Sequence, residues 1–167
     1  MPDKRRKKPP RSWSMFPDLH DQVADKLEEH QLNYTFFEKD EGIGATRTFD
    51  TNIVGQFICH NNKCNSRGWK SMVVAITIRE YSRNRYNVRV YHQRCLGCNY
   101  LSKPKLKEET YVDRVTYRIK KWNGVEVEQP IYSDKAKAPH EEDHCEGCKA
   151  GHCKKGKKYN GDDMYFA

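Results

Sequence analysis

The cysteines are the residues best suited to chemistry in this sequence, and most of them fall into closely spaced pairs. Two pairs have CxxC spacing, CLGC at 95–98 and CEGC at 145–148, and CHNNKC at 59–64 is a wider pair. A seventh cysteine, Cys153, lies five positions after Cys148. Two thiolates from one such turn reach a Zn²⁺ ion at about 2.3 Å each, and a second turn completes a tetrahedron. The spacing therefore predicts zinc sites.

Three predicted strands indicate which cysteine pairs lie close together. Residues 46–59, 71–81 and 85–95 are rich in β-branched and aromatic side chains, and the short link SRN joins the last two as a hairpin. In an antiparallel meander the first and third strands end at the same edge of the sheet. The cysteine pairs at 59–64 and 95–98 should therefore meet and hold one zinc ion in the manner of a zinc ribbon.

The other three cysteines need a fourth ligand to form a second tetrahedral site. His140, His144 and His152 are the candidates. His144 and His152 adjoin cysteines, and neighbouring residues rarely ligate the same ion. His140 precedes Cys145 by five positions, which repeats the spacing of the last two cysteines. We predict His140 as the ligand and the other two as bystanders; a ligand set exchanged between the two sites is the alternative.

Redox or catalytic chemistry fits these residues less well. A thioredoxin-like CxxC opens a helix that follows a strand, and no helical pattern follows CLGC directly. A catalytic zinc needs an open coordination position and a nearby general base. Glu141, Glu142 and Glu146 lie near the second site, but closed, thiolate-rich ligand sets are typically structural. We expect no enzymatic activity and no small-molecule substrate.

The remaining pattern predicts a small α+β domain with an antiparallel meander, two helices and zinc-ribbon-like knuckles. Only 36% of the residues are hydrophobic, so the core should be small. Helical spacing predicts an N-terminal helix at 17–30 and a second at 110–122, with Thr110 and Asp113 as a capping box and Gly124 as its stop. Residues 32–39 suggest a loop or strand, and the alternating residues from Val125 suggest a short strand that ends at Pro130.

Charge separates the two ends from the middle of the chain. The net charge is +8, of which residues 1–12 carry +5 and residues 154–167 carry +2. We expect a basic disordered arm at 1–12, one zinc-binding domain at 13–153 and a basic flexible tail at 154–167. With no signal-peptide pattern and no transmembrane run, the expected location is cytoplasmic or nuclear, where thiols stay reduced, and no membrane insertion is expected.

Four segments together resemble the 3CxxC-type zinc-finger family, which includes the receptor-transporting and zygote arrest proteins and many fungal members. They are FIC…C…GWKS, YNVRVYHQRCLGC, YVDRVTYRIKKWNG and PHEEDHCEGCKAGHC, and the third is most similar to fungal members. The resemblance implies no catalytic activity and a structural Zn²⁺ cofactor, two ions in all. Its implied ligands are Cys59, Cys64, Cys95, Cys98, His140, Cys145, Cys148 and Cys153.

The chain departs from that family in two respects. The vertebrate pattern tends to open with CxxC, and CHNNKC introduces His60 as an alternative ligand. Receptor-transporting proteins carry a C-terminal membrane anchor, which we do not expect here. Zygote arrest proteins use the finger to contact RNA, so the resemblance favours that partner.

Two functions are expected from these features. The first is a nucleic-acid-binding module, for RNA above DNA, and the second is a chaperone-like trafficking adaptor that binds a protein partner. The candidate contact residues are cations on the hairpin and the second helix, with two aromatic rings that would stack on bases. They are Arg83, Arg85, Arg89, Arg94, Arg118, Lys120, Lys121, Trp69 and Tyr91.

Overall fold

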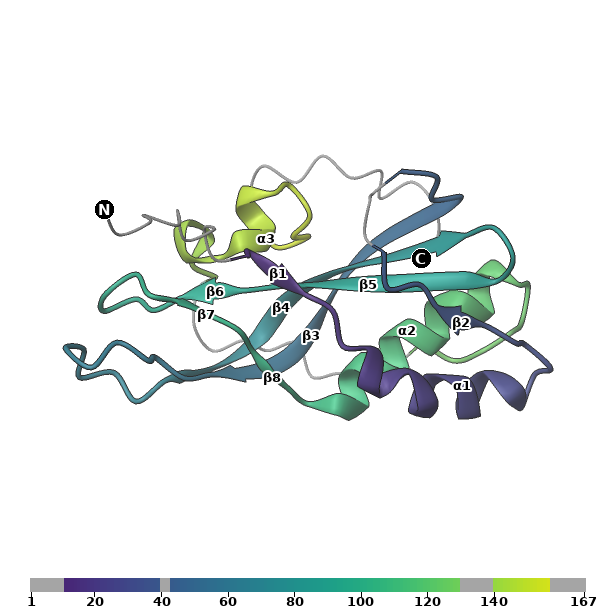
Figure 1. Cartoon of the computed structure of the whole chain (residues 1–167), viewed down its shortest axis with the longest axis horizontal. Helices are drawn as coiled ribbons and strands as arrows, with labels where there is room; N and C mark the ends of the chain where they lie inside the picture. Colours follow the sequence, from purple (N-terminus) through teal and green to yellow (C-terminus); the bar gives the residue numbers. More distant parts are fainter. Residues whose placement is uncertain (1–10, 40–42, 130–139, 157–167) are drawn as a thin grey trace, which may run out of the picture.

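The centre of the protein is a twisted sheet whose three long strands follow one another along the chain (Figure 1). The computed structural model describes residues 11–39, 43–129 and 140–156. Strands β3 (Arg47–Phe57), β4 (Trp69–Tyr81) and β5 (Arg85–Tyr91) pair antiparallel in that order. This pairing confirms the predicted meander. The β-branched side chains on both faces of these strands favour the extended conformation.

The turn between β4 and β5 has the geometry that a tight hairpin requires. Tyr81 pairs with Arg85, so three residues link the strands, and two of them, Arg83 and Asn84, have left-handed φ values of 63° and 53°. Left-handed residues in so short a link let the chain reverse while the flanking strands keep their twist. This turn lies at the end of the sheet opposite the cysteine pairs.

Short strands extend the sheet at both edges. β1 (Trp13–Ser14) pairs antiparallel and β2 (Thr35–Phe36) parallel with different parts of β5. At the other edge β8 (Lys105–Leu106) pairs with β3. β6 (Gln93–Arg94) and β7 (Leu101–Ser102) form a separate two-stranded sheet. The β2 segment falls within the loop or strand expected at 32–39 and β6 within the strand expected at 85–95, which the structure interrupts at His92. The other short strands were not expected, because two-residue strands carry no periodicity.

Two helices cover one face of the sheet and form the main core with it (Figure 1). A 3₁₀ turn, η1 (Pro17–Leu19), leads into α1 (His20–Glu28), and α2 (Glu108–Trp122) packs beside α1. The predicted helices at 17–30 and 110–122 therefore exist with shifted ends. None of the described helices is long and apolar enough to cross a bilayer. The largest fully buried side chains in this core include Leu27, Phe57, Ile76, Ile78, Tyr86, Tyr111 and Ile119.

The predicted capping box of α2 is wrong, whereas its predicted stop is confirmed. The helix begins at Glu108, so Thr110 lies in its first turn and cannot be the N-cap residue. The Thr110 hydroxyl instead donates to the Lys107 carbonyl and accepts the N–H of Val54, which ties the helix to β3. Gly124, with φ 73°, follows the last turn as a glycine stop should.

The short strand expected from Val125 to Pro130 is wrong, because residues 125–129 form no strand, and Pro130 lies outside the described part of the chain. The N–H of Val125 bonds back to the carbonyl of Lys120 and so belongs to the end of α2.

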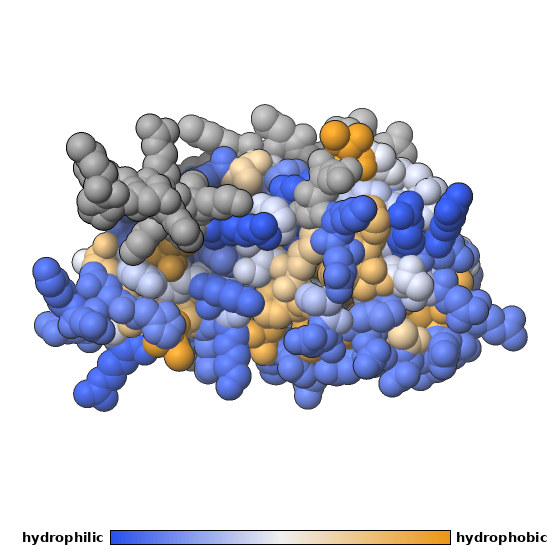
Figure 2. Space-filling model, viewed as in Figure 1, coloured by the Kyte–Doolittle hydropathy of each residue, from blue (hydrophilic) through white to orange (hydrophobic). Residues whose placement is uncertain are grey.

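The opposite face of the sheet carries a small C-terminal unit, which contains η2 (Glu142–His144) and α3 (Glu146–Lys149) (Figure 1). Its apolar contacts with the sheet form a second buried cluster of Val73, Ala75, Tyr91, Cys145 and Cys153. Figure 2 shows that polar side chains dominate the surface on this view, with apolar ones exposed between them.

The expected tails are described only in part. Residues 1–10 and 157–167 lie outside the described chain. Ser12 is already part of the fold, because its carbonyl accepts the N–H of His92 next to β1. Lys154 also contacts the domain, since its ammonium group lies 4.1 Å from the centre of the Phe49 ring. Contacts with the domain therefore include one described residue on each side of 13–153.

Candidate metal centres

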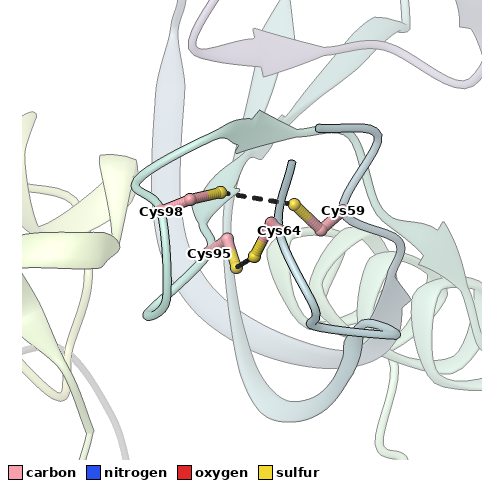
Figure 3. A group of neighbouring side chains, drawn as sticks. All are labelled: Cys59, Cys64, Cys95 and Cys98. Atoms are coloured by element: carbon pink, nitrogen blue, oxygen red, sulfur yellow. Dashed lines mark hydrogen bonds between the residues drawn. The ribbon is translucent and has the colours of Figure 1, made fainter. Parts of the chain in front are cut away.

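The first group of cysteines lies at the end of the sheet where two loops meet (Figure 3). Cys59 and Cys64 come from the loop between β3 and β4, and Cys95 and Cys98 from the loop between β6 and β7. The Sγ atoms of Cys59 and Cys98 are 3.4 Å apart, and those of Cys64 and Cys95 are 3.8 Å apart. Tetrahedral zinc with bonds of about 2.3 Å separates two sulfurs by about 3.8 Å. The four thiols fit one zinc ion.

Backbone N–H groups from the tight turns point at these sulfurs. Burial raises the pKa of Cys95, but the N–H groups of Gly97 and Cys98 outweigh it and lower that pKa to about 6. The N–H of Ser66 donates to Cys64 Sγ over 3.5 Å. A zinc ligand must be a thiolate, so donors that favour the thiolate also favour metal binding.

The second group joins one histidine to the last three cysteines. His140 Nε2 lies 3.2 Å from Cys148 Sγ and 3.5 Å from Cys153 Sγ. All four ligand atoms, including Cys145 Sγ, lie within 4.8 Å of one another. The thiol of Cys145 and the nearby His140 favour the Cys153 thiolate and, against the opposing effect of burial, lower its pKa to about 4. This set fits a second zinc ion.

The other histidines lie outside both groups. His152 Nδ1 is 3.1 Å from the carboxylate of Asp50, and its ring stacks on Tyr91 with centroids 5.9 Å apart. His144 Nδ1 is buried without a hydrogen-bond partner in the described chain. His60 is exposed and packs edge-on against Tyr100. Of the four histidine candidates, the structure therefore places only His140 among the ligands.

Close packing fixes the second group against the sheet. A Cβ atom on Gly147 would lie 2.4 Å from the Cβ of Ala75, so only glycine allows α3 to approach β4 this closely. The N–H of Glu146 bonds to the carbonyl of His92, and its carboxylate pairs with Arg94 at 2.7 Å. Burial raises the Glu146 pKa, but Arg94 and Lys149 lower it by more. The C-terminal zinc knuckle, residues 140–153, is thus part of the second buried cluster.

Most of the predicted contact residues are engaged within the fold. Tyr91 is wrong as a stacking platform, because its side chain is only 1% exposed between the sheet and His152. Trp69 stacks on Phe57 with centroids 5.0 Å apart, and its Nε1 donates to Gln93. These rings pack in the interior because each lies on a sheet face that another element covers.

The predicted cations are dispersed over the molecule. Arg83 and Arg85 lie at the β4–β5 turn, whereas Lys120 and Lys121 lie in the last turn of α2. The guanidinium groups of Arg85, Arg89 and Arg118 lie over the rings of Phe37, Trp13 and Phe49. Arg94, paired with Glu146, is the predicted cation nearest the first metal group. The predicted residues therefore do not form one surface.

A different basic surface surrounds the first metal group, and sequence reasoning missed it. We call residues 58–70 and 93–107 the tip. Residues 51–107 contain eleven Lys or Arg and one acidic residue, Glu80, so the tip has no carboxylate. The signal was readable in the sequence as a long interval with eleven cations and a single acidic residue. The seven cations of the tip are Lys63, Arg67, Lys70, Arg94, Lys103, Lys105 and Lys107.

Comparison with known proteins agrees with the two metal groups. A family model described as a zinc-binding domain, the zinc ribbon of 3CxxC type, matches residues 52–151, which is more than half of the chain. Seven of the eight grouped ligands fall inside the match, and Cys153 lies two residues beyond it. No curated protein and no solved structure matches the chain.

Proposed function

The chain belongs to the 3CxxC zinc-ribbon family of zinc-binding domains, and on this premise we propose a non-enzymatic module whose tip binds nucleic acid, RNA in particular. Zinc is structural in this proposal. Each group offers four protein ligands, which fills the tetrahedral shell that zinc prefers and leaves no position for substrate. The proposed location is the cytoplasm or nucleus, where the thiols remain reduced.

The charge of the tip is the observation that carries the proposal. All of its cations except Arg94 are exposed, and none of these six forms an ion pair with a described carboxylate. Four thiolates and one Zn²⁺ contribute a charge of about −2, which leaves the tip clearly positive. A cluster of free cations without carboxylates attracts phosphates and releases their counterions on binding.

The sheet presents some of these cations in a fixed row. Lys70 on β4 and Lys105 on β8 both lie opposite Gln56 of β3, so the three side chains point to the same face. Lys103 continues the basic surface towards a groove of about 630 Å³ whose lining includes Arg11, Trp13, Phe36 and Glu38. A phosphate chain can therefore follow a track of cations rather than a single contact.

The salt dependence of binding tests this function. Zinc-loaded protein should bind short RNA with an affinity that falls steeply as salt is added. If four to six exposed cations meet phosphates, log K against log salt should have a slope of about −3 to −4 for single strands. Fluorescence anisotropy from 50 to 300 mM salt measures it. Binding that is absent, or insensitive to salt, would refute a phosphate-binding role for the tip.

A protein-binding adaptor is the second candidate, and one specific observation favours it. Ile58, Leu96 and Tyr100 are exposed apolar side chains at the tip, with 56%, 66% and 41% of their surface accessible. Apolar side chains that gather on a surface often mark a protein interface. In this case the protein should show no salt-sensitive RNA or DNA binding and should instead retain a protein partner at high salt.

A further inference from the structure

We infer that the tip selects single-stranded nucleic acid and contacts its bases, with Tyr100 and His60 as the stacking surface beside the first zinc group. This inference rests on the proposed nucleic-acid-binding function and adds the form of the ligand and the residues that read it. Single-stranded RNA and single-stranded DNA both offer the required chemistry, which is an exposed base on a flexible phosphate chain.

The placement of exposed apolar surface carries the inference. Within the described chain, four large hydrophobic residues are exposed, and three of them, Ile58, Leu96 and Tyr100, lie at the tip. Each is adjacent to a zinc-ligand turn: Ile58 precedes Cys59, and Leu96 lies inside CLGC. Cations alone suffice to bind phosphates. Apolar side chains among these cations therefore indicate contact with the bases of the strand as well as with its phosphate backbone.

Two aromatic rings at the tip come from the two different loops. The rings of His60 and Tyr100 have centroids 6.4 Å apart and an interplanar angle of 65°. Both residues are exposed, so ring surface remains accessible to a ligand. Successive bases of a single strand stack on such rings irrespective of sequence, whereas a duplex keeps its bases paired and stacked internally.

The cysteine turn holds Tyr100 in place. The N–H of Cys95 donates to the Tyr100 carbonyl at 2.9 Å, and the N–H of Asn99 donates to the Cys95 carbonyl at 2.7 Å. Asn99 has φ 63°, which reverses the chain, and β7 begins immediately afterwards at Leu101. The main chain of Tyr100 is therefore held by the same turn that binds the metal, and a ring on a preorganised backbone loses less entropy on binding.

The charges beside these rings favour nucleic acid over an apolar peptide. Lys63 lies in the His60 loop, and Lys103, whose ammonium group lies 4.9 Å from the centre of the Phe16 ring, follows Tyr100 by three positions in the sequence. No carboxylate of the tip repels phosphates. A strand that stacks its bases on the rings can thus place its phosphates on these cations.

The test replaces the ring while keeping its apolar character. Tyr100→Leu should lower affinity for single-stranded RNA and single-stranded DNA about five- to hundredfold, as expected for the loss of one stacked base. Affinity for a duplex of equal length should change less than twofold. Tyr100→Phe keeps the ring and should retain near wild-type affinity, and Ile43→Ala removes an exposed apolar group away from the tip as the matched control.

The outcomes separate this inference from the function on which it rests. Zinc content and circular dichroism first establish that each variant is folded. If the wild type binds RNA in a salt-sensitive way but Tyr100→Leu binds equally well, or loses single-strand and duplex binding in parallel, base stacking at Tyr100 is refuted and the proposed function stands. If the wild type binds neither single strands nor duplexes, the proposed function itself fails.

Discussion

Cys153→Ser should remove the second zinc ion and most of the free energy that keeps the protein folded. The Cys153 side chain is 1% exposed and packs with Cys145, Val73, Ala75 and Tyr91 against the sheet. Structural zinc contributes an apparent free energy of about 10–16 kcal/mol, whereas a domain has a net stability of only about 5–15 kcal/mol. Loss of this ion would also leave polar groups buried at the sheet face. We therefore expect a variant without a cooperative thermal transition.

Cys98→Ser is the matched control. Cys98 is only half-buried and belongs to the group at the end of the sheet, outside both apolar clusters. This variant should lose one zinc ion, disorder the tip and still melt cooperatively at a lower temperature. Calorimetry with zinc analysis compares the two variants. The claim that the second zinc site stabilises the fold more than the first would be contradicted if both variants unfolded equally. It would also be contradicted if Cys153→Ser were stable and kept two ions.

Reversing two charges at the tip should have the largest effect on binding. Lys63→Glu with Arg67→Glu changes two exposed cations near the first metal group. Because each phosphate contact contributes about 0.7 to the salt slope of single-strand binding, the slope should become shallower by about 1.4. Affinity should fall on the order of 10- to 100-fold near 0.1 M salt. Anisotropy titrations at several salt concentrations measure both effects.

The same change in net charge elsewhere provides the control for that pair. Lys39→Glu with Arg83→Glu alters two exposed cations, one after β2 and one at the β4–β5 turn, away from the tip. Its effect should be limited to long-range electrostatics, which salt screens over about 10 Å at 0.1 M. If both double variants weaken binding equally, the affinity follows overall charge and the tip is not the binding surface.

Where long segments repeat one pattern, the sequence predicted the fold well. The meander followed from β3, β4 and β5, and its direction correctly placed the cysteine pairs at 59–64 and 95–98 together. Strands of this length bury alternating side chains on both faces, so the period is visible. Two-residue strands such as β1 and β8 depend on a neighbouring edge and leave no such pattern.

Local patterns failed where a tertiary contact used the same residue for another purpose. Thr110 has the right type for an N-cap, yet its hydroxyl bonds Val54 on β3 from inside the helix. Tyr91 resembled a surface ring on an alternating strand, but the C-terminal knuckle covers that face. Pairing within a sheet can be read from periodicity, whereas what covers its second face depends on a segment fifty residues later.

The site was predictable in its ligands but not in its surroundings. Spacing alone indicated His140 over His144 and His152, since only a ligand separated from Cys145 by a short loop can point at the same ion. The contact residues were chosen as scattered cations, although folding divides them between the two ends of the sheet and α2. The absence of acidic residues from the tip was a stronger signal, because a charge bias persists however the loops fold.

Counting the zinc ions tests the central claim most directly. Native mass spectrometry of the purified protein should give two zinc ions per chain, and Cys98→Ser, which should stay folded, should remove one. Two independent tetrahedral sites require this count, because each group has four ligand atoms within 4.8 Å of one another. A wild-type protein that holds a single zinc ion, or a single substitution that removes both ions at once from a still-folded chain, would contradict the account.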